Sequence, residues 1–191
     1  MGLFYKPTDK EILEIRKKIF FDKGLPLFQK YGYEKSPFST GYFGRDNNGD
    51  YHFELCKLTE TSLLEIVSVN IVKGDKWIQI SLNIFQLDQE IKELSQLNQV
   101  DGLKFLLPPN NFSNMRLHVN DFKGTPLLNY DFWFKNHKLK GYFTKAGFNK
   151  SIEKLGKRIE IDLTNFNKYV ERWFKLHKPF VGGSYSLSTH F

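Results

Sequence analysis

The chain has 191 residues, 40% of them hydrophobic and 26% charged, with 19 Phe, 9 Tyr and 3 Trp. Such a length and aromatic content support a folded core without disulfides or metals, and they exclude an intrinsically disordered chain. The net charge of +7 is uneven, because residues 96–191 carry 15 Lys and Arg against 7 Asp and Glu, whereas residues 1–95 carry 13 against 14. This asymmetry indicates an anionic partner, unless the charge serves only solubility.

The cysteine content and the N-terminal segment indicate where the protein resides. A single cysteine, Cys56, excludes an internal disulfide and a cysteine-based metal site, and it fits a reducing compartment. The segment after Met1 lacks the apolar stretch of a secretory signal, and no apolar run approaches the roughly 18 residues that span a bilayer. We therefore expect a cytoplasmic protein without a membrane span.

The first predicted element is an amphipathic helix. Residues 8–11, Thr-Asp-Lys-Glu, match a capping box, in which the side chains at both ends of the motif bond to the backbone of the first helical turn. Apolar residues follow at helical spacing, namely Ile12, Ile15 and Ile19. We expect Gly24 to end this helix in the left-handed conformation, and residues 26–31 to add a turn that ends at Gly32.

The next segment predicts strands. Residues 42–45 lead into a turn signal at 46–50, and residues 51–56 then alternate apolar with polar side chains. Residues 63–72 are rich in β-branched side chains, and residues 78–84 alternate most regularly. The links between these strands are too short for parallel crossovers, so the pattern predicts an antiparallel meander.

Helix and strand signals alternate in the rest of the chain. Asp88 is expected to open a short helix, residues 115–119 and 128–134 alternate like strands, and residues 146–155 have helical spacing. Ile159 and Ile161 suggest a brief strand.

A last helix closes the predicted order of elements. Thr164 is expected to cap it, and its apolar face comprises Phe166, Tyr169, Val170, Trp173 and Phe174. Residues 184–191 are expected to form a mobile tail. The whole order predicts a single α+β domain over residues 1–191, with a mostly antiparallel sheet and helices packed on one face.

Enzymatic motifs are missing from the sequence. His52, Glu54 and Cys56 would share one strand face, but same-face neighbours lie roughly 7 Å apart, which is too far for a nucleophile and its base. Glu160 and Asp162 would share a face of the brief predicted strand, where solvated neighbours are a simpler interpretation than paired catalytic carboxylates. No phosphate-binding or metal-binding motif is present, so we expect no cofactor and no metal. A catalytic site assembled from distant segments stays open.

A basic and aromatic stretch supplies the candidate binding residues. Lysines there would contact an acidic surface or phosphates, and an outward ring would anchor a partner or stack on a base. The alternative is a sheet edge protected by lysines against pairing with other chains. The candidate binding residues are Trp133, Lys135, His137, Lys138, Lys140 and Tyr142.

Short motifs in the first half carry a family resemblance. Leu27-Phe28 and Tyr31-Gly32-Tyr33 end the predicted helical segment, Phe43-Gly44-Arg45 follows in a strand, and residues 80–84 form a polar–apolar run. This layout resembles an uncharacterised bacterial domain family that accompanies polymorphic toxins and is thought to include immunity proteins. The resemblance implies a non-enzymatic α+β protein that binds and neutralises a toxin. The alternative hypothesis is a nucleic-acid-binding domain that uses the basic second half.

Overall fold

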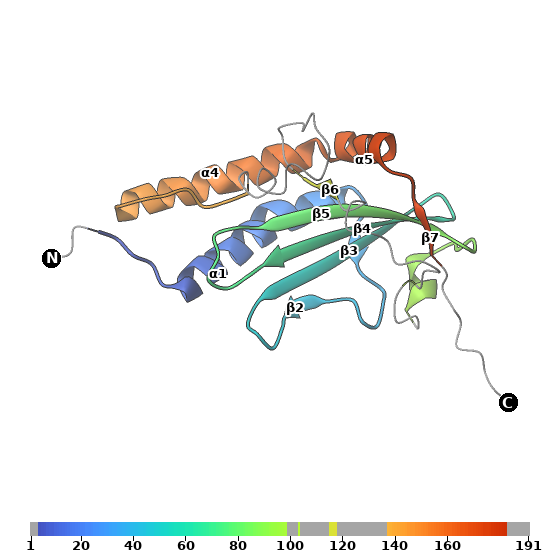
Figure 1. Ribbon diagram of the computed structural model, residues 1–191, viewed down its shortest axis with the longest axis horizontal. Helices are drawn as coiled ribbons and strands as arrows, with labels where there is room; N and C mark the ends of the chain where they lie inside the picture. Colours follow the sequence, from blue (N-terminus) through green and yellow to red (C-terminus); the bar gives the residue numbers. More distant parts are fainter. Residues whose placement is uncertain (1–3, 99–102, 104–114, 118–136, 183–191) are drawn as a thin grey trace.

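The computed structural model describes residues 4–98, 103, 115–117 and 137–182 (Figure 1). Its helices are α1 (Asp9–Ile19), the π-helix η1 (Phe20–Gly24), α2 (Leu25–Lys30), the 3-10 helix η2 (Leu94–Leu97), α4 (Lys145–Thr164) and α5 (Phe166–Leu176). Its strands are β1 (Glu34–Lys35), β2 (Phe43–Arg45), β3 (Tyr51–Thr59), β4 (Leu63–Ile71), β5 (Gln79–Leu87), β6 (Met115–Arg116) and β7 (Phe180–Gly182).

Three strands of nine residues each, β3, β4 and β5, form the centre of the sheet. They pair antiparallel in chain order, as the short links predict, while the shorter β1 and β2 pair with the free edge of β3. On the free edge of β5, β6 pairs antiparallel and β7 parallel. The predicted α+β fold with a mostly antiparallel sheet is therefore confirmed.

The α-helices cover one face of this sheet (Figure 1). The register places Leu55 opposite Val67 and Val67 opposite Leu82, so an apolar row crosses the three central strands. Side chains from α1, α4 and α5, including the fully buried Trp173, join that row in the main core. A smaller cluster that includes Cys56 and Leu97 lies around the opposite face.

The N-terminal helix begins as predicted and ends differently. The capping box is present, with the Glu11 amide donating to Thr8 Oγ1 at 3.2 Å and the Thr8 amide donating to Glu11 Oε2 at 2.7 Å. The prediction for Gly24 was wrong, because its φ of −87° is right-handed and the chain continues through η1 into α2. A Cβ there would lie 2.7 Å from the Phe20 ring, so this glycine permits close packing, whereas Gly32, at φ +83°, provides the left-handed turn.

The prediction of a brief strand at Ile159–Ile161 was also wrong. Both residues lie in α4, whose buried positions continue the helical period through Phe148, Leu155, Ile159 and Leu163. Glu160 and Asp162 therefore do not share a strand face. The N-cap position of the last helix is Asn165, whose side chain makes no capping hydrogen bond, and not Thr164, whose hydroxyl donates to the Glu160 carbonyl within α4.

The middle of the chain gave mixed outcomes. The helix predicted from Asp88 is reduced to η2, which has four residues, because Leu94 and Leu97 pack as a short apolar turn against the smaller cluster. The strand predicted at 115–119 is found in part as β6. The strand predicted at 128–134 and the tail predicted at 184–191 lie outside the described residues.

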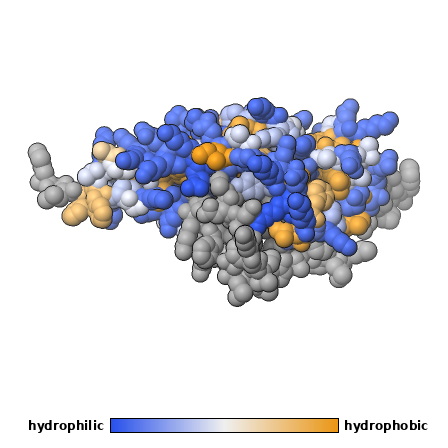
Figure 2. Space-filling model, turned by 90° about the horizontal axis from the view of Figure 1, so that it is seen from above, coloured by the Kyte–Doolittle hydropathy of each residue, from blue (hydrophilic) through white to orange (hydrophobic). Residues whose placement is uncertain are grey.

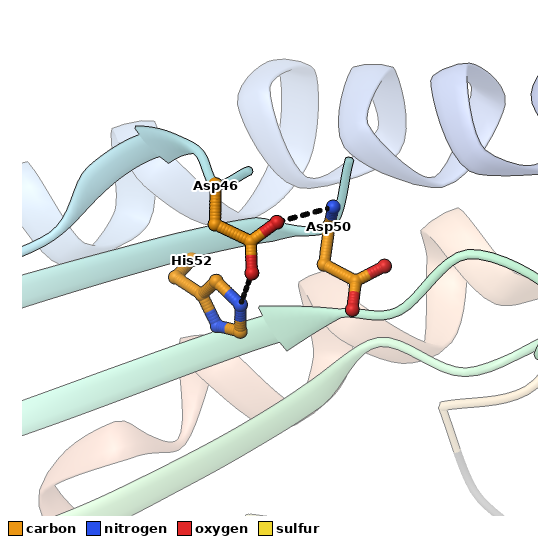
Figure 3. Close-up of side chains that lie close together, drawn as sticks. All are labelled: Asp46, Asp50 and His52. Carbon is orange, nitrogen blue, oxygen red and sulfur yellow. Dashed lines mark hydrogen bonds and ion pairs between the residues drawn. The ribbon is translucent and has the colours of Figure 1, made fainter. Parts of the chain in front are cut away.

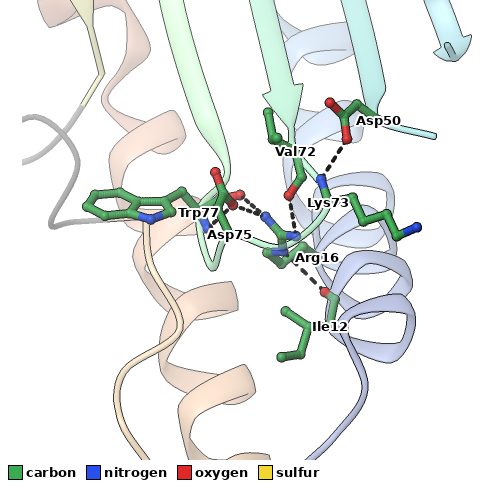
Figure 4. Close-up of polar contacts among 7 residues, drawn as sticks. All are labelled: Ile12, Arg16, Asp50, Val72, Lys73, Asp75 and Trp77. Atoms are coloured by element: carbon green, nitrogen blue, oxygen red, sulfur yellow. Dashed lines mark hydrogen bonds and ion pairs between the residues drawn. The ribbon is translucent and has the colours of Figure 1, made fainter. Parts of the chain in front are cut away.

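A buried arginine fixes α1 to the end of the sheet (Figure 4). The Arg16 side chain is fully buried and donates to the carbonyls of Val72, at 2.8 Å, and Trp77, at 2.6 Å. It also forms an ion pair with Asp75, and its Nε donates back to the Ile12 carbonyl at 3.2 Å. The guanidinium thus joins α1 to the β4–β5 turn and sets the position of the helix on the sheet.

Candidate functional site

The predicted binding residues lie in different surroundings. Trp133 and Lys135 lie outside the described residues. His137 is 5% exposed, and its Nε2 lies 2.6 Å from Oδ2 of the buried Asp162 in α4. This contact ties the segment before α4 to the helix and turns the His137 ring inward, so a surface role for this residue has no support in the geometry.

The other three candidates lie nearer the surface. Lys138 Nζ is 4.4 Å from the centre of the Trp77 ring, which is a cation–π contact within the protein. Lys140 is exposed, and Tyr142 is half-buried with its ring 4.5 Å from that of Phe148. Lys140 is thus the most accessible of the three, and the binding role of the set stays a prediction.

The catalytic alternative around Cys56 is not supported by the geometry. Cys56 is fully buried, and this burial raises the pKa of its thiol to about 12, although the neighbouring Ser36 partly offsets the effect. The His52 ring contacts Asn70 Oδ1 at 2.7 Å and Asp46 Oδ2 at 3.2 Å, and neither contact activates the thiol. A thiol that stays protonated at neutral pH and has no base beside it among the described residues is a poor nucleophile.

Asp46, Asp50 and His52 form a polar cluster at the turn between β2 and β3 (Figure 3). One ligand atom of each lies within 4.8 Å of the others, a spacing that suits a metal ion. Asp46 Oδ1, however, accepts from the Asp50 amide at 2.8 Å, and Asp50 Oδ1 accepts from the Lys73 amide at 2.7 Å. Both carboxylates are thus already engaged in closing the turn and joining it to the end of β4. The cluster stabilises the hairpin, and we call it the clasp.

The turn at 46–50 could be predicted from the sequence, but the contacts among Asp46, Asp50 and His52 could not. Burial raises the pKa of Asp46, but hydrogen bonds from the Asp50 amide and from His52 outweigh that effect and lower it overall. The signal available in the sequence was the aspartate at the first turn position, which commonly accepts backbone hydrogen bonds. The ring of His52 reaches the Asp46 carboxylate only because the β2–β3 hairpin folds back on itself.

A second buried polar group lies inside the main core. The Tyr33 hydroxyl donates to Glu65, which is 2% exposed, and Thr59 Oγ1 donates to the same carboxylate at 2.5 Å. Burial and the charge of Glu65 raise the pKa of Tyr33, so its hydroxyl remains a donor. These contacts satisfy a carboxylate in the core and leave it no access to a ligand.

The helix layer carries an open apolar groove. The groove has a volume of about 480 Å³ and lies between the α1–η1 segment and α4. Its floor is aliphatic, formed by Ile15, Ile19, Ile152 and the backbone at Gly156. A Cβ at position 156 would lie 4.0 Å from Ile19 Cγ2, in ordinary contact, so glycine leaves this space in the groove unfilled.

Charged side chains line the rims of the groove. Lys18 and Asp22 form an ion pair of 3.0 Å along the first rim, and Lys23 reaches across to Glu160 of α4 at 3.6 Å. Figure 2 views the molecule from above, and on this face hydrophilic side chains predominate and apolar ones form small separate patches. The groove is therefore an apolar strip between charged borders.

The outer side of α4 is basic. Lys157 lines the groove, and Lys150 and Lys154 precede it by seven and three residues, which places all three on one side of the helix. All three are exposed, and none takes part in an ion pair with another described residue. Residues 137–182 contain eleven Lys and Arg against four Asp and Glu, a net charge of +7 that equals that of the whole chain.

No protein-family model, curated protein or solved structure matches the chain. The resemblance to toxin-associated immunity domains therefore stays a prediction. In the part of the chain that the structure describes, every helix is too short or too polar to cross a membrane.

Proposed function

We propose that the protein is a non-enzymatic protein-binding domain and that the groove between α1–η1 and α4 is its binding site. The observation that carries the proposal is the aliphatic floor left open between two charged rims. Its volume of about 480 Å³ falls in the range of pockets that bind ligands. Apolar anchors in such a depression, surrounded by polar contacts, are typical of protein recognition.

The rigidity of the groove supports the proposal. Arg16 fixes α1 to the sheet, and the buried His137–Asp162 contact fixes α4 to the segment that precedes it. Both walls of the groove are thus held by buried polar contacts on their inner sides. A site that is formed before binding loses less conformational entropy when the partner arrives.

The finer proposal is that the partner is a bacterial toxin, which the domain neutralises by binding. Its support is the family resemblance in the first half of the chain, together with the basic α4, which suits an acidic surface of a toxin. Opposite charge on two partners speeds their encounter and disfavours wrong partners.

Capture of the partner tests the proposal. The tagged protein is incubated with nuclease-treated lysate of the source organism, and bound proteins are identified by mass spectrometry. We expect one stoichiometric protein with the wild type, and its loss with Ile152→Glu, which places a charge on the groove floor. Leu176→Glu is the matched control, since Leu176 is exposed at the end of α5, away from the groove, and we expect it to retain the partner.

Two results would count against the proposal. If the wild type and Ile152→Glu captured the partner in equal amounts, and circular dichroism showed both proteins to be folded, the groove would be excluded as the site. Recovery of nucleic acid alone, in a parallel capture without nuclease, would favour the alternative function, for which the net charge of residues 137–182 is the specific observation.

A further inference from the structure

We infer that the occupant of the groove is an amphipathic helix of a partner protein, with acidic residues along the edge that faces α4. This inference rests on the proposed function and adds the chemistry of the partner. Three properties of the groove carry it, namely its shape, the distribution of charge on its two rims and the aliphatic nature of its floor.

The shape of the groove favours a helix. Its lining residues recur every four positions on both walls, at 15, 19 and 23 on one side and at 152, 156 and 160 on the other. The apolar strip therefore runs along the helix axes for about two turns, or roughly 12 Å. A helix presents side chains at the same interval, and apolar residues at positions i, i+4 and i+7 would enter the strip together.

The small size of the floor disfavours a second copy of this chain as occupant. Three isoleucines and one glycine form the floor. A stable protein–protein interface typically takes about 20 to 30 residues from each partner. A single helix in the groove needs far fewer apolar contacts with the floor than a dimer interface does. Its other contacts are made with the charged side chains of the rims.

The charges of the two rims differ, and the difference favours an acidic edge on the α4 side. On the α1 side, the charges of Lys18 and Asp22 cancel within their own ion pair, and Lys23 is occupied by Glu160. On the α4 side, Lys157 lies at the rim and continues outward into Lys150 and Lys154. Glu160 is paired with Lys23, so Glu153 is the one other carboxylate among the groove-lining residues of α4, and the exposed Lys150, Lys154 and Lys157 outnumber it on this side of the helix.

The aliphatic floor favours protein over nucleic acid. Proteins that bind single strands place aromatic rings where bases stack, whereas this groove is lined by aliphatic and charged side chains. A helix with aliphatic side chains on one face and carboxylates along one edge would pack on the floor and form ion pairs with the lysines of α4.

A display library of helical peptides tests the inference on the full-length protein. Every peptide carries apolar residues at i, i+4 and i+7, and the positions beside them hold either Glu or Lys. We expect the wild type to enrich peptides with Glu along one edge, binding about tenfold more tightly than their Lys counterparts, as three exposed ion pairs would give. Affinities of the enriched peptides are measured by fluorescence anisotropy.

Two sets of variants separate the contributions of floor and rim. Ile152→Glu should abolish binding of the enriched peptides. The triple change Lys150→Glu, Lys154→Glu and Lys157→Glu should reverse the preference from Glu to Lys peptides. The matched control is the triple change Lys168→Glu, Lys175→Glu and Lys178→Glu, which alters the net charge equally at exposed positions elsewhere and should leave the preference intact.

The outcomes distinguish this inference from the proposal on which it rests. Enriched peptides that need Ile152 but show no preference for Glu would overturn the acidic helix and leave the groove as a binding site. A library without any peptide that depends on Ile152 would overturn the helical occupant, and the capture experiment with Ile152→Glu would then decide whether the groove binds a protein at all. Binding of a single-stranded DNA oligonucleotide that is lost in the Lys150, Lys154 and Lys157 variant but kept in Ile152→Glu would assign the lysine row to nucleic acid and also overturn the inference.

Discussion

Arg16 and Lys23 lie seven residues apart in one continuous helical segment, yet their charges serve different ends. Arg16 points to the sheet, is fully buried and is held by Asp75 and by backbone carbonyls. Lys23 points to the groove, with its side chain 48% exposed and its partner Glu160 50% exposed. Water replaces a lost partner at the second site but not at the first, so the inner charge holds the fold while the outer ion pair contributes little to stability.

The largest expected effect follows from removing the inner charge. Arg16→Met should destabilise the protein by about 3–5 kcal/mol, because Asp75 and two partly buried carbonyls lose a charged donor. Urea unfolding followed by circular dichroism measures the change, with Arg45→Met at the exposed hairpin as the matched control. If the free energy of unfolding fell by less than about 1 kcal/mol, Arg16 would contribute no more than a surface residue such as Lys23.

The contacts of Arg16 are an example of what could not be predicted from the sequence. Alternating strands and the capping box are local signals, since each depends on residues within a few positions, and the fold class could be predicted from them. The contacts of Arg16 join residues 56 to 61 positions apart, and those of Tyr33 and Glu65 join residues 32 apart. A charged residue in an amphipathic helix gives no local sign that it is buried, so these contacts could not be predicted.

The same distinction applies to the candidate site. The basic character of the second half could be read from composition, and the three exposed lysines of α4 are part of it. The groove depends on α1–η1 and α4 lying side by side, which no local pattern specifies. The predicted strand at Ile159–Ile161 also divided α4 in two, because isolated β-branched residues favour a strand until the neighbouring helical period is followed through Leu163.

A partly exposed contact should give an intermediate effect that depends on pH. The side chains of His52 and Asp46 are 31% and 16% exposed, and the pKa of Asp46 in the folded protein is lowered. A carboxylate with a lowered pKa stabilises the fold above its ordinary value of about 3.9, and this contribution is lost as the pH falls through the folded pKa. Asp46→Asn should therefore be less stable than the wild type at pH 6.

The pH profile is the decisive measurement for the clasp. Urea midpoints of wild type and Asp46→Asn are compared from pH 6 downward, and their difference should shrink below about pH 4, where the carboxylate takes up its proton. The asparagine keeps an oxygen that accepts from the Asp50 amide, so the variant tests the charge and not the turn. A difference that is constant with pH would show that the charge of Asp46 contributes nothing.

The smallest effect is expected for the ion pair that crosses the groove. A double-mutant cycle with Lys23→Ala, Glu160→Ala and the double variant should give a coupling of about 0.2–1 kcal/mol, because both side chains are half exposed. This coupling should fall when the ionic strength is raised, since salt screens exposed charges. Coupling of more than about 2 kcal/mol that salt leaves unchanged would mean that the pair is shielded from water. The groove would then be a closed seam between α1–η1 and α4, and an inserted helix would first have to break it.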